Sequence, residues 1–322
     1  PAMGQVIDKT LNCVYCKQTC ATVRAYNPAA DYGEITEPFV DTGSKIVSML
    51  FGYDYQYYTR QDPLTATHDV RHMYRILERA DQSACTVVCD YDIGSPGFPT
   101  KQLFVHYLRG AASKCRPGDW FVFFYGGHGE NMSGSSRIEM FGVDQAFVTP
   151  TPDGNIAREA SYLVDDQFAL ALDQCVPPGV KILCLIDCCH SGSICDIDSY
   201  RYTHEIYCLS ACKDDQEAED TGSGGVFTQA LGYANHTLST KYGANKEWSI
   251  QEMFDVTDDY ARAAITTNQA LNFTWSGTSP ARVAWPLGTT LSAYFSGAHH
   301  KMDGQKIDYH GIPADFLKES YS

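Results

Sequence analysis

Short segments that are apolar at nearly every position recur along the chain, and they constrain its fold more than any other feature. Runs of this length and composition are typical of strands that are buried on both faces of a sheet. Between them lie segments with apolar residues at helical spacing, as at residues 68–80. We therefore expect strands at residues 46–51, 85–89, 120–125, 180–186 and 205–210, with a final edge strand at 282–285.

Buried strands that alternate with amphipathic helices predict an α/β fold. The central sheet should be mostly parallel and flanked by helices on both faces, giving a three-layer sandwich. One of the helices should follow the capping box Ser249-x-x-Glu252, in which a serine side chain accepts a backbone hydrogen bond. The expected helices cover residues 68–80, 100–115, 166–174, a segment through Phe227, Leu231 and Tyr233, and 253–265.

The composition excludes some classes of function. The 39 Asp and Glu residues outnumber the 24 Lys and Arg residues and give a net charge of −15, which argues against nucleic-acid binding. This charge suits a cationic partner, such as Ca²⁺ or a basic substrate side chain, although it can also serve solubility alone. No apolar run approaches the roughly 20 residues that span a bilayer, so we expect no membrane partner.

The chain has 13 cysteines, an odd number, and several stand inside apolar segments. Buried thiols behave as small apolar groups, which predicts a reduced, cytoplasmic protein; a disulfide framework is the alternative. Near the N-terminus, Cys13, Cys16 and Cys20 have the spacing of part of a zinc site. No fourth ligand is evident nearby, so ordinary thiols are the simpler interpretation.

Two polar, glycine-containing loops follow buried strands, at the sheet edge where parallel folds form their sites. The first is YGGHGE at residues 125–130, and the second is DCCHSGS at residues 187–193. A histidine among glycines after a strand is held by rigid backbone yet stays open to a ligand, although it can also close a turn without any function.

A cysteine and a histidine on two such loops form the reactive pair of a thiol peptidase, because a neighbouring imidazole favours the nucleophilic thiolate. The backbone N–H groups of Gly129 and Cys189 are natural oxyanion donors. The alternatives are a redox pair, a metal site of Cys188, Cys189 and His190, and a phosphatase-like thiolate. Adjacent cysteines are poor joint ligands of one tetrahedral metal, and a phosphatase needs an arginine closer than Arg201.

Four motifs in this order resemble those of the metacaspases, a family of caspase-like cysteine peptidases. The first loop resembles the family's Y-S-G-H-G, and the second matches D-C-C-H-S-G-[ST] at every position. Residues 210–220 are similar to S-A-C-x-D-x-Q-x-[SA]-x-D, and residues 224–228 to G-G-x-F-T. The match of the second loop is specific, whereas the first loop alone would be weak.

The resemblance implies a caspase-like fold with the large-subunit part first, as in type I members. The peptidase domain would cover residues 45–288, divided into a p20-like part at 45–205 and a p10-like part at 206–288. An N-terminal extension or pro-segment at 1–44 and a C-terminal tail at 289–322 would flank it.

The resemblance also implies roles for single residues. The second cysteine of the pair is the nucleophile in this family, which selects Cys189 over Cys188, with His128 as the general base. The family cleaves after Arg or Lys, and the carboxylates of its S1 pocket match Asp69 and Asp187. A helix-capping role is the alternative for Asp69. Two positions depart from the family pattern in ways that weaken polar contacts to the P1 side chain: a serine is replaced by Gly126, and a small polar residue or cysteine by Ala66.

Calcium is the cofactor that the resemblance implies. Three carboxylates, those of Asp165, Asp166 and Asp196, match the family's activating site, and Glu139 or Asp144 is a candidate for the remaining ligand. Sets of oxygen ligands suit Ca²⁺. The alternative is that Asp165 or Asp166 caps the helix that follows.

We therefore expect a monomeric, calcium-activated cysteine endopeptidase that cleaves protein or peptide substrates after Arg or Lys. Residues 1–44 would cover the cleft as a pro-segment, and self-cleavage would follow a loop Lys or Arg. One alternative is a low-activity binding or scaffold protein, against which the intact Cys–His pair argues. The other is an Asp-specific caspase, against which the absence of Q-A-C-x-G and the acidic pocket argue.

Overall fold

The computed structural model describes residues 44–58, 60, 63–80, 82–91, 98–132, 144–243, 247–265 and 267–288. The predicted pro-segment up to residue 43, its three cysteines, Glu139 and the predicted tail lie outside the described residues, and the predicted domain boundaries stay predictions. None of the helices in the described ranges combines the length and apolarity that a membrane crossing requires.

A six-stranded sheet forms the centre of the molecule, in the order β2-β1-β3-β7-β8-β9. Its first five strands are parallel, and β9 is antiparallel to β8. Every residue of β1 and β3 is buried, which explains why these segments are apolar at successive positions. The strands are β1 (Ile46–Gly52), β2 (Ala84–Cys89), β3 (Trp120–Gly126), β7 (Lys181–Asp187), β8 (Ile206–Ser210) and β9 (Asn272–Ser276).

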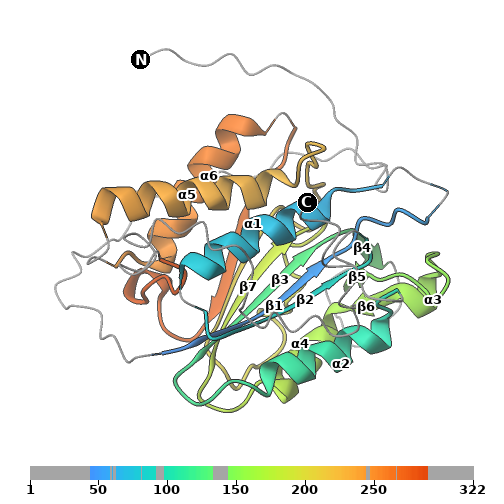
Figure 1. The fold of residues 1–322 in the computed structure, drawn as a ribbon, viewed down its shortest axis with the longest axis horizontal. Helices are drawn as coiled ribbons and strands as arrows, with labels where there is room; N and C mark the ends of the chain where they lie inside the picture. Colours follow the sequence, from blue (N-terminus) through green and yellow to red (C-terminus); the bar gives the residue numbers. More distant parts are fainter. Residues whose placement is uncertain are drawn as a thin grey trace, which may run out of the picture.

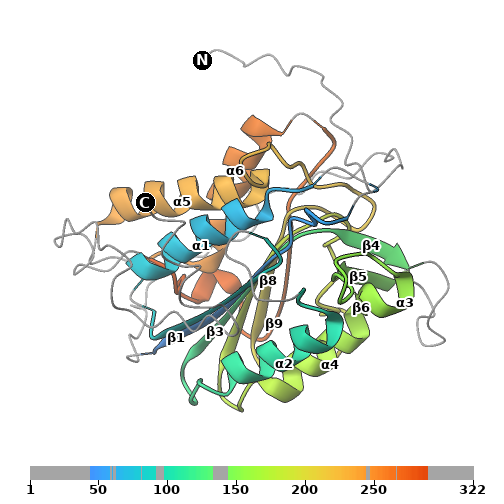
Figure 2. The ribbon, with the colours of Figure 1, turned by 45° about the vertical axis from the view of Figure 1, so that its right-hand side comes forward.

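Helices cover both faces of this sheet, so the predicted three-layer α/β sandwich is confirmed (Figure 1). On one face lie α1 (Ala66–Arg79), α5 (Val226–Tyr242) and α6 (Ile250–Ala264). On the other lie α2 (Lys101–Ala112) and α4 (Asp165–Cys175), as Figure 2 also shows. The predicted helices are therefore confirmed, with ends that differ by up to a turn.

A second, smaller sheet stands at the end of the central one, near α4 (Figure 1). It is antiparallel in the order β4-β5-β6, and was not predicted. Its strands are β4 (Gly129–Met132), β5 (Asp144–Val148) and β6 (Tyr162–Val164), and the short helix α3 (Arg158–Ser161) precedes β6. Because β4 begins directly after His128, this sheet fixes the loop that follows β3.

The predicted edge strand at 282–285 is wrong. Part of it belongs to a short 3-10 helix, η1 (Pro280–Arg282), and Ala284 makes only an isolated bridge to Ser249. The edge is β9 instead, whose residues are half-buried or exposed and therefore need no continuous apolar run. The capping serine is confirmed, since the Ser249 Oγ accepts a 3.0 Å hydrogen bond from the Glu252 backbone N–H.

Candidate active site

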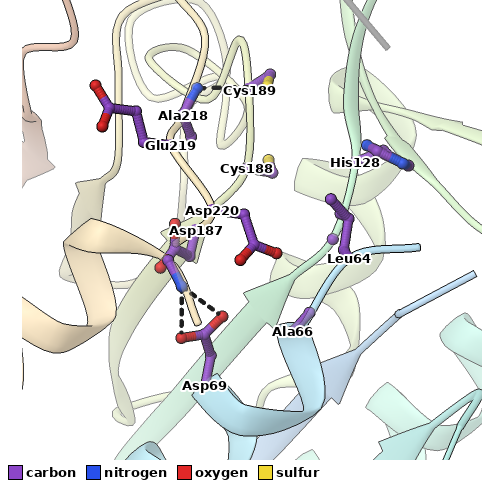
Figure 3. A pocket seen from close by; sticks show the side chains of 12 residues that line it. Leu64, Ala66, Asp69, His128, Asp187, Cys188, Cys189, Ala218, Glu219 and Asp220 are labelled. Carbon is purple, nitrogen blue, oxygen red and sulfur yellow. Dashed lines mark hydrogen bonds between the residues drawn. The ribbon is translucent and has the colours of Figure 1, made fainter. Parts of the chain in front are cut away.

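The two glycine-containing loops meet because their strands are neighbours in the sheet. Strands β3 and β7 pair in parallel, with Gly126 opposite Asp187 at their carboxyl ends. Just beyond, the Gly127 N–H donates to the Asp187 carbonyl oxygen at 3.3 Å. As predicted, this register brings His128 and Cys189 to the same edge of the sheet, where both line one pocket (Figure 3).

The pocket is built from four segments that are far apart in the sequence. They are the start of α1, the loop after β3, the loop after β7, and the segment before α5. Figure 3 shows the sulfur and imidazole groups near one end and a group of carboxylates near the other. The lining residues are Leu64, Ala66, Asp69, Gly127, His128, Asp187, Cys188, Cys189, Ala218, Glu219, Asp220 and Gly225.

Gly129 stands where the small sheet touches the cysteine loop. A Cβ atom at this position would lie 1.9 Å from the Cys189 carbonyl oxygen and 2.9 Å from the Cys188 Sγ, so no larger residue fits without displacing the loop. The glycine thus lets the backbone of β4 approach Cys189 closely. The two backbone N–H groups predicted as oxyanion donors therefore belong to segments in direct contact.

The two adjacent cysteines differ in their surroundings. The Cys188 side chain packs into the apolar cluster between the sheet and α2 and α4, together with Ile186 and Cys195. The Cys189 Sγ instead accepts a hydrogen bond from the Ala218 backbone N–H at 3.4 Å. Both side chains are almost fully buried, and the polar contact of Cys189 is the one suited to a thiolate.

The backbone of His128 is held on both sides by tyrosine hydroxyls. Its N–H donates to the Tyr55 hydroxyl at 3.0 Å, and its carbonyl oxygen accepts from the Tyr125 hydroxyl at 2.9 Å. The same carbonyl accepts from the Val148 N–H of β5 at 3.1 Å. The imidazole ring stacks on the Tyr55 ring, with centroids 4.5 Å apart and planes inclined by 25°.

Asp69 and Asp187, the predicted S1 carboxylates, both line the pocket, and both also contact the start of α5. The Asp69 carboxylate accepts from the Gly225 N–H at 2.9 Å. The Asp187 carboxylate accepts from the Thr228 N–H at 3.0 Å and its Oγ1 at 2.6 Å. Glycines are needed here, because a Cβ at Gly225 would lie 2.3 Å from the Asp187 Oδ2. Asp69 therefore does not simply cap its own helix; its carboxylate binds the N-terminus of α5.

Burial perturbs both carboxyl groups. Desolvation, followed by repulsion from Asp187, raises the pKa of Asp69 well above its ordinary value. Desolvation also raises the pKa of Asp187 to about 6, against the favourable hydrogen bonds from Thr228. Because a carboxylate is costly to bury without an opposite charge, this pair is electrostatically suited to a cationic group.

A third carboxylate of the pocket belongs to Asp220, the last residue of the 210–220 motif, for which the sequence alone indicates no role. Its side chain accepts from the Thr65 N–H at 2.7 Å and the Thr65 Oγ1 at 2.6 Å, and so ties the segment before α5 to the segment before α1. Its place at the end of the 210–220 motif was the signal that could have identified it.

The two departures from the family pattern are neighbours in space. A Cβ atom on Gly126 would lie 3.2 Å from the Ala66 Cβ, so both positions border the same small volume near the acidic pair. A serine at 126 would have to share this volume with the side chain at 66. In this volume the pocket therefore lacks the two polar side chains of the family pattern, whereas it keeps its carboxylates.

Two of the predicted calcium ligands, Asp165 and Asp166, lie in the first turn of α4. The Asp165 carboxylate accepts from the backbone N–H groups of Gln145 at 2.8 Å and Asp166 at 2.9 Å. Desolvation raises its pKa to about 7, and the charges of Asp144 and Asp196 add to this shift. Carboxylate oxygens are ligands of the type that Ca²⁺ prefers. Within the ranges that the structure describes, however, no three His, Cys, Asp or Glu residues are arranged to hold a metal ion.

In the described part of the chain, three residues other than glycine have a positive φ, and all three belong to predicted site segments or contact them. They are Tyr55 at 55°, His190 at 53° and Asp196 at 48°. The His190 Nδ1 donates to the Asp214 carbonyl oxygen at 2.7 Å, which holds the segment after Cys189 in place. Sparsely populated backbone conformations are retained where surrounding contacts over-determine them, often near functional sites.

Comparison with known proteins finds similarity to one family over part of the chain. Residues 48–198 match the family described as metacaspase, peptidase C14 domain. Metacaspase-2 of Arabidopsis thaliana is 28% identical over 162 residues, which are 42% of this chain and 38% of that protein. Metacaspase-3 of Trypanosoma brucei brucei is 24% identical over 245 residues, covering 64% of this chain and 66% of the relative. The chain thus spans about two-fifths to two-thirds of these relatives' own lengths.

Two solved structures share the fold. Caspase-1 of Spodoptera frugiperda has a TM-score of 0.50 and 13% sequence identity, covering 77% of this chain and 92% of that structure. A protein from Geobacter sulfurreducens has a TM-score of 0.54 and 20% identity, covering 76% of this chain and 99% of that structure. At these identities the likeness concerns the fold alone, and it confirms the predicted caspase-like sandwich.

Proposed function

We propose that this chain is a cysteine endopeptidase that cleaves peptide bonds after Arg or Lys, and the match of residues 48–198 to the metacaspase peptidase domain supports this. The observation that carries this proposal is one pocket that contains Cys189 and His128 at one end and buried carboxylates at the other. Cys189 and His128 supply the reactivity, and the carboxylates supply the selectivity for a cationic side chain.

The chemistry follows from the arrangement of these groups. His128 takes the proton of the Cys189 thiol, and the thiolate attacks the scissile carbonyl carbon to form a tetrahedral oxyanion. The backbone N–H groups of Gly129 and Cys189 donate to that oxyanion. Its collapse breaks the C–N bond, the imidazolium protonates the departing amine, and a thioester remains on Cys189. Water, deprotonated by His128, then hydrolyses the thioester and restores the thiol.

The acidic end of the pocket supports the preference for a basic P1 side chain. A guanidinium or ammonium group would compensate the buried charges of Asp69 and Asp187, whose pKa values are raised by burial. Ala66 and Gly126 offer no side-chain hydrogen bond there, so recognition would rest mainly on charge. An Asp at P1 would be repelled.

We also propose that Ca²⁺ activates the protein through Asp165, Asp166 and Asp196, with Asp144 as a further candidate ligand. The proximity of Asp144 and Asp196 to Asp165 supports this, since their charges raise the Asp165 pKa. The catalytic steps use only residues of the chain, and Ca²⁺ takes no part in them. When bound, Ca²⁺ would neutralise this acidic group and fix the small sheet that begins at Gly129.

A peptide assay tests the function. Fluorogenic peptides with Arg, Lys or Asp at P1 are incubated with the protein at 0 and about 5 mM Ca²⁺, a concentration that saturates even weak sites. We expect hydrolysis of the Arg and Lys peptides, dependent on Ca²⁺, and none of the Asp peptide. Cys189→Ala should abolish turnover, whereas Cys188→Ala should retain most of it. Loss in Cys188→Ala with activity in Cys189→Ala would reverse the assignment of the nucleophile.

The same assay addresses the alternatives. No turnover of any peptide by folded protein at millimolar Ca²⁺ would favour the binding or scaffold protein, and cleavage after Asp would favour the caspase. Incubation with Ca²⁺ followed by N-terminal sequencing of fragments tests self-cleavage. Fragments formed equally by Cys189→Ala would show that another protease made them.

A further inference from the structure

The orientation of a catalytic histidine must be fixed by its surroundings, since the imidazole has to face the sulfur it deprotonates. Here Tyr55, which comes from the segment after β1, contacts His128 in two ways. Its ring lies face to face with the imidazole, with centroids 4.5 Å apart, and its hydroxyl accepts the His128 backbone N–H at 3.0 Å. One side chain therefore holds both the ring and the backbone of His128.

We propose that Tyr55 is the positioning residue of this active site, holding the His128 imidazole in its reactive orientation through the ring stack and the hydroxyl contact. The inference rests on the proposed peptidase function. In this role Tyr55 acts only through His128.

Tyr55 is itself held rigidly. Its backbone N–H and that of Asp54 donate to the two carboxylate oxygens of Asp90 at 2.8 and 2.7 Å. The Asp54 carboxylate in turn accepts from the Thr67 N–H and Oγ1 at the start of α1, at 2.8 and 2.7 Å. These bonds compensate the positive φ of 55° at Tyr55, a conformation that is unfavourable for a bulky residue. The chain thus maintains an unfavourable backbone state at the residue that contacts His128.

The hydroxyl network explains the glycine before the histidine. The Tyr55 hydroxyl donates to the Val148 carbonyl oxygen at 2.7 Å and lies 3.3 Å from the Tyr125 hydroxyl. A Cβ atom on Gly127 would lie 2.9 Å from the Tyr55 oxygen and 2.8 Å from the Tyr125 oxygen. Only a glycine lets both hydroxyls reach the backbone beside His128. The ring face adds a chemical benefit, because an aromatic face attracts the imidazolium that forms when the thiol loses its proton.

Tyr55→Phe tests the hydroxyl, and Tyr53→Phe is its matched control. Both side chains are buried in the same segment, and the Tyr53 hydroxyl donates to the Pro99 carbonyl oxygen at 3.3 Å without touching His128. For Tyr55→Phe we expect kcat on the Arg peptide to fall about tenfold with KM within about twofold of wild type, the size of one lost hydrogen bond that acts on the base. Alkylation of Cys189 by iodoacetamide, followed by mass spectrometry, should slow by the same factor.

Tyr55→Leu removes the stack as well and should lower kcat and the alkylation rate about 100-fold. If this variant does not fold, Tyr55→Phe carries the test. Tyr53→Phe also removes a buried hydroxyl and should keep kcat and the alkylation rate. The inference is overturned if the two Phe variants behave alike in both rates, or if Tyr55→Phe raises KM alone. Failure of the wild-type protein to cleave any peptide would instead overturn the proposed function, and the alkylation rates would still decide the role of Tyr55.

Discussion

At the scale of single residues, Asp69 shows the conflict between stability and function in this pocket. Its side chain is 3% exposed, and its pKa is raised well above the ordinary value by burial and by Asp187. A carboxyl group whose pKa is higher in the folded than in the unfolded protein destabilises the fold at any pH where it must ionise. The pair is therefore retained at a cost in stability, which a cationic substrate side chain would offset.

Asp69→Asn should raise stability and lower activity together. The amide oxygen can still accept the Gly225 N–H, but the buried charge is lost. At pH 7.5 we expect the unfolding temperature to rise by about 2–4 °C. The value of kcat/KM on the Arg peptide should fall about 10–100-fold, the range of one charge-assisted hydrogen bond. Differential scanning fluorimetry and the peptide assay measure the two effects.

Asp119→Asn is the matched control. Asp119 is also buried and also accepts backbone N–H groups, those of Lys45 and Arg116, but it lies at the opposite end of β3 from the pocket. This variant should gain no stability and should keep its kcat/KM. If Asp69→Asn kept full activity on the Arg peptide, Asp69 would not belong to the S1 pocket.

At the scale of helices and strands, the sequence predicted those elements whose burial leaves a clear apolar pattern. Strands β1, β3 and β7 lie inside the sheet, and their continuous apolar runs follow from burial on both faces. Strand β9 was missed because an edge strand with one exposed face carries no such run. The small sheet was missed because its strands are three to five residues long and β4 looks like a polar loop.

The residues of the candidate site likewise divide into those that the sequence predicted and those that it did not. His128 and Cys189 were predicted because each follows a buried strand, and register alone then brings them together. The contact of Tyr55 with His128 was not predictable, because it joins positions 73 residues apart through a turn with a positive φ. The place of Asp220 in the pocket was not predictable either. It depends on the shape of the loop before α5, which distant contacts such as that with Thr65 determine.

Helix capping provides a test of element stability. Ser249→Ala removes the hydrogen bond that its Oγ accepts at the start of α6, and should destabilise the fold by about 1 kcal/mol. Thr100→Ala is the control, since Thr100 has the same N-cap position on α2 but makes no side-chain capping bond. We expect Ser249→Ala to unfold about 2–4 °C lower and Thr100→Ala to match wild type, with activity unchanged in both. Equal losses of stability would show that the capping bond of Ser249 contributes nothing.

At the scale of the whole molecule, buried acids and the net charge of −15 act in the same direction. Desolvation raises the pKa of Asp54 and Asp187 to about 6, and of Asp90 and Asp165 to about 7. In the unfolded chain these groups titrate near 3.8, so between pH 3.8 and 7 the folded protein binds more protons than the unfolded one. Stability should therefore be greatest at the acidic side of this window and decline as pH rises through it.

We expect the unfolding temperature of the metal-free protein to rise as the pH is lowered from 8 to 5.5, measured by scanning fluorimetry in EDTA at constant ionic strength. This is opposite to a protein whose carboxylates are stabilised by salt bridges, which loses stability on acidification. Among the described residues, two pairs of Lys or Arg with a carboxylate lie within 4.0 Å, both on the surface, so they offer little opposing effect. A steady fall in unfolding temperature from pH 8 to 5.5 would contradict the raised pKa values.

Calcium should reverse this dependence, because a ligand that binds only the folded protein stabilises it, and this one requires ionised carboxylates. Asp165 must lose its proton to bind the metal, and its pKa of about 7 makes this easier at pH 7.5 than at 5.5. We therefore expect 5 mM Ca²⁺, about the level that fills weak sites, to raise the unfolding temperature at pH 7.5 and much less at pH 5.5. Asp165→Asn should lose the shift, and Mg²⁺, which demands a tighter octahedral site, should give a smaller one. An equal shift in Asp165→Asn would place the calcium site elsewhere in the chain.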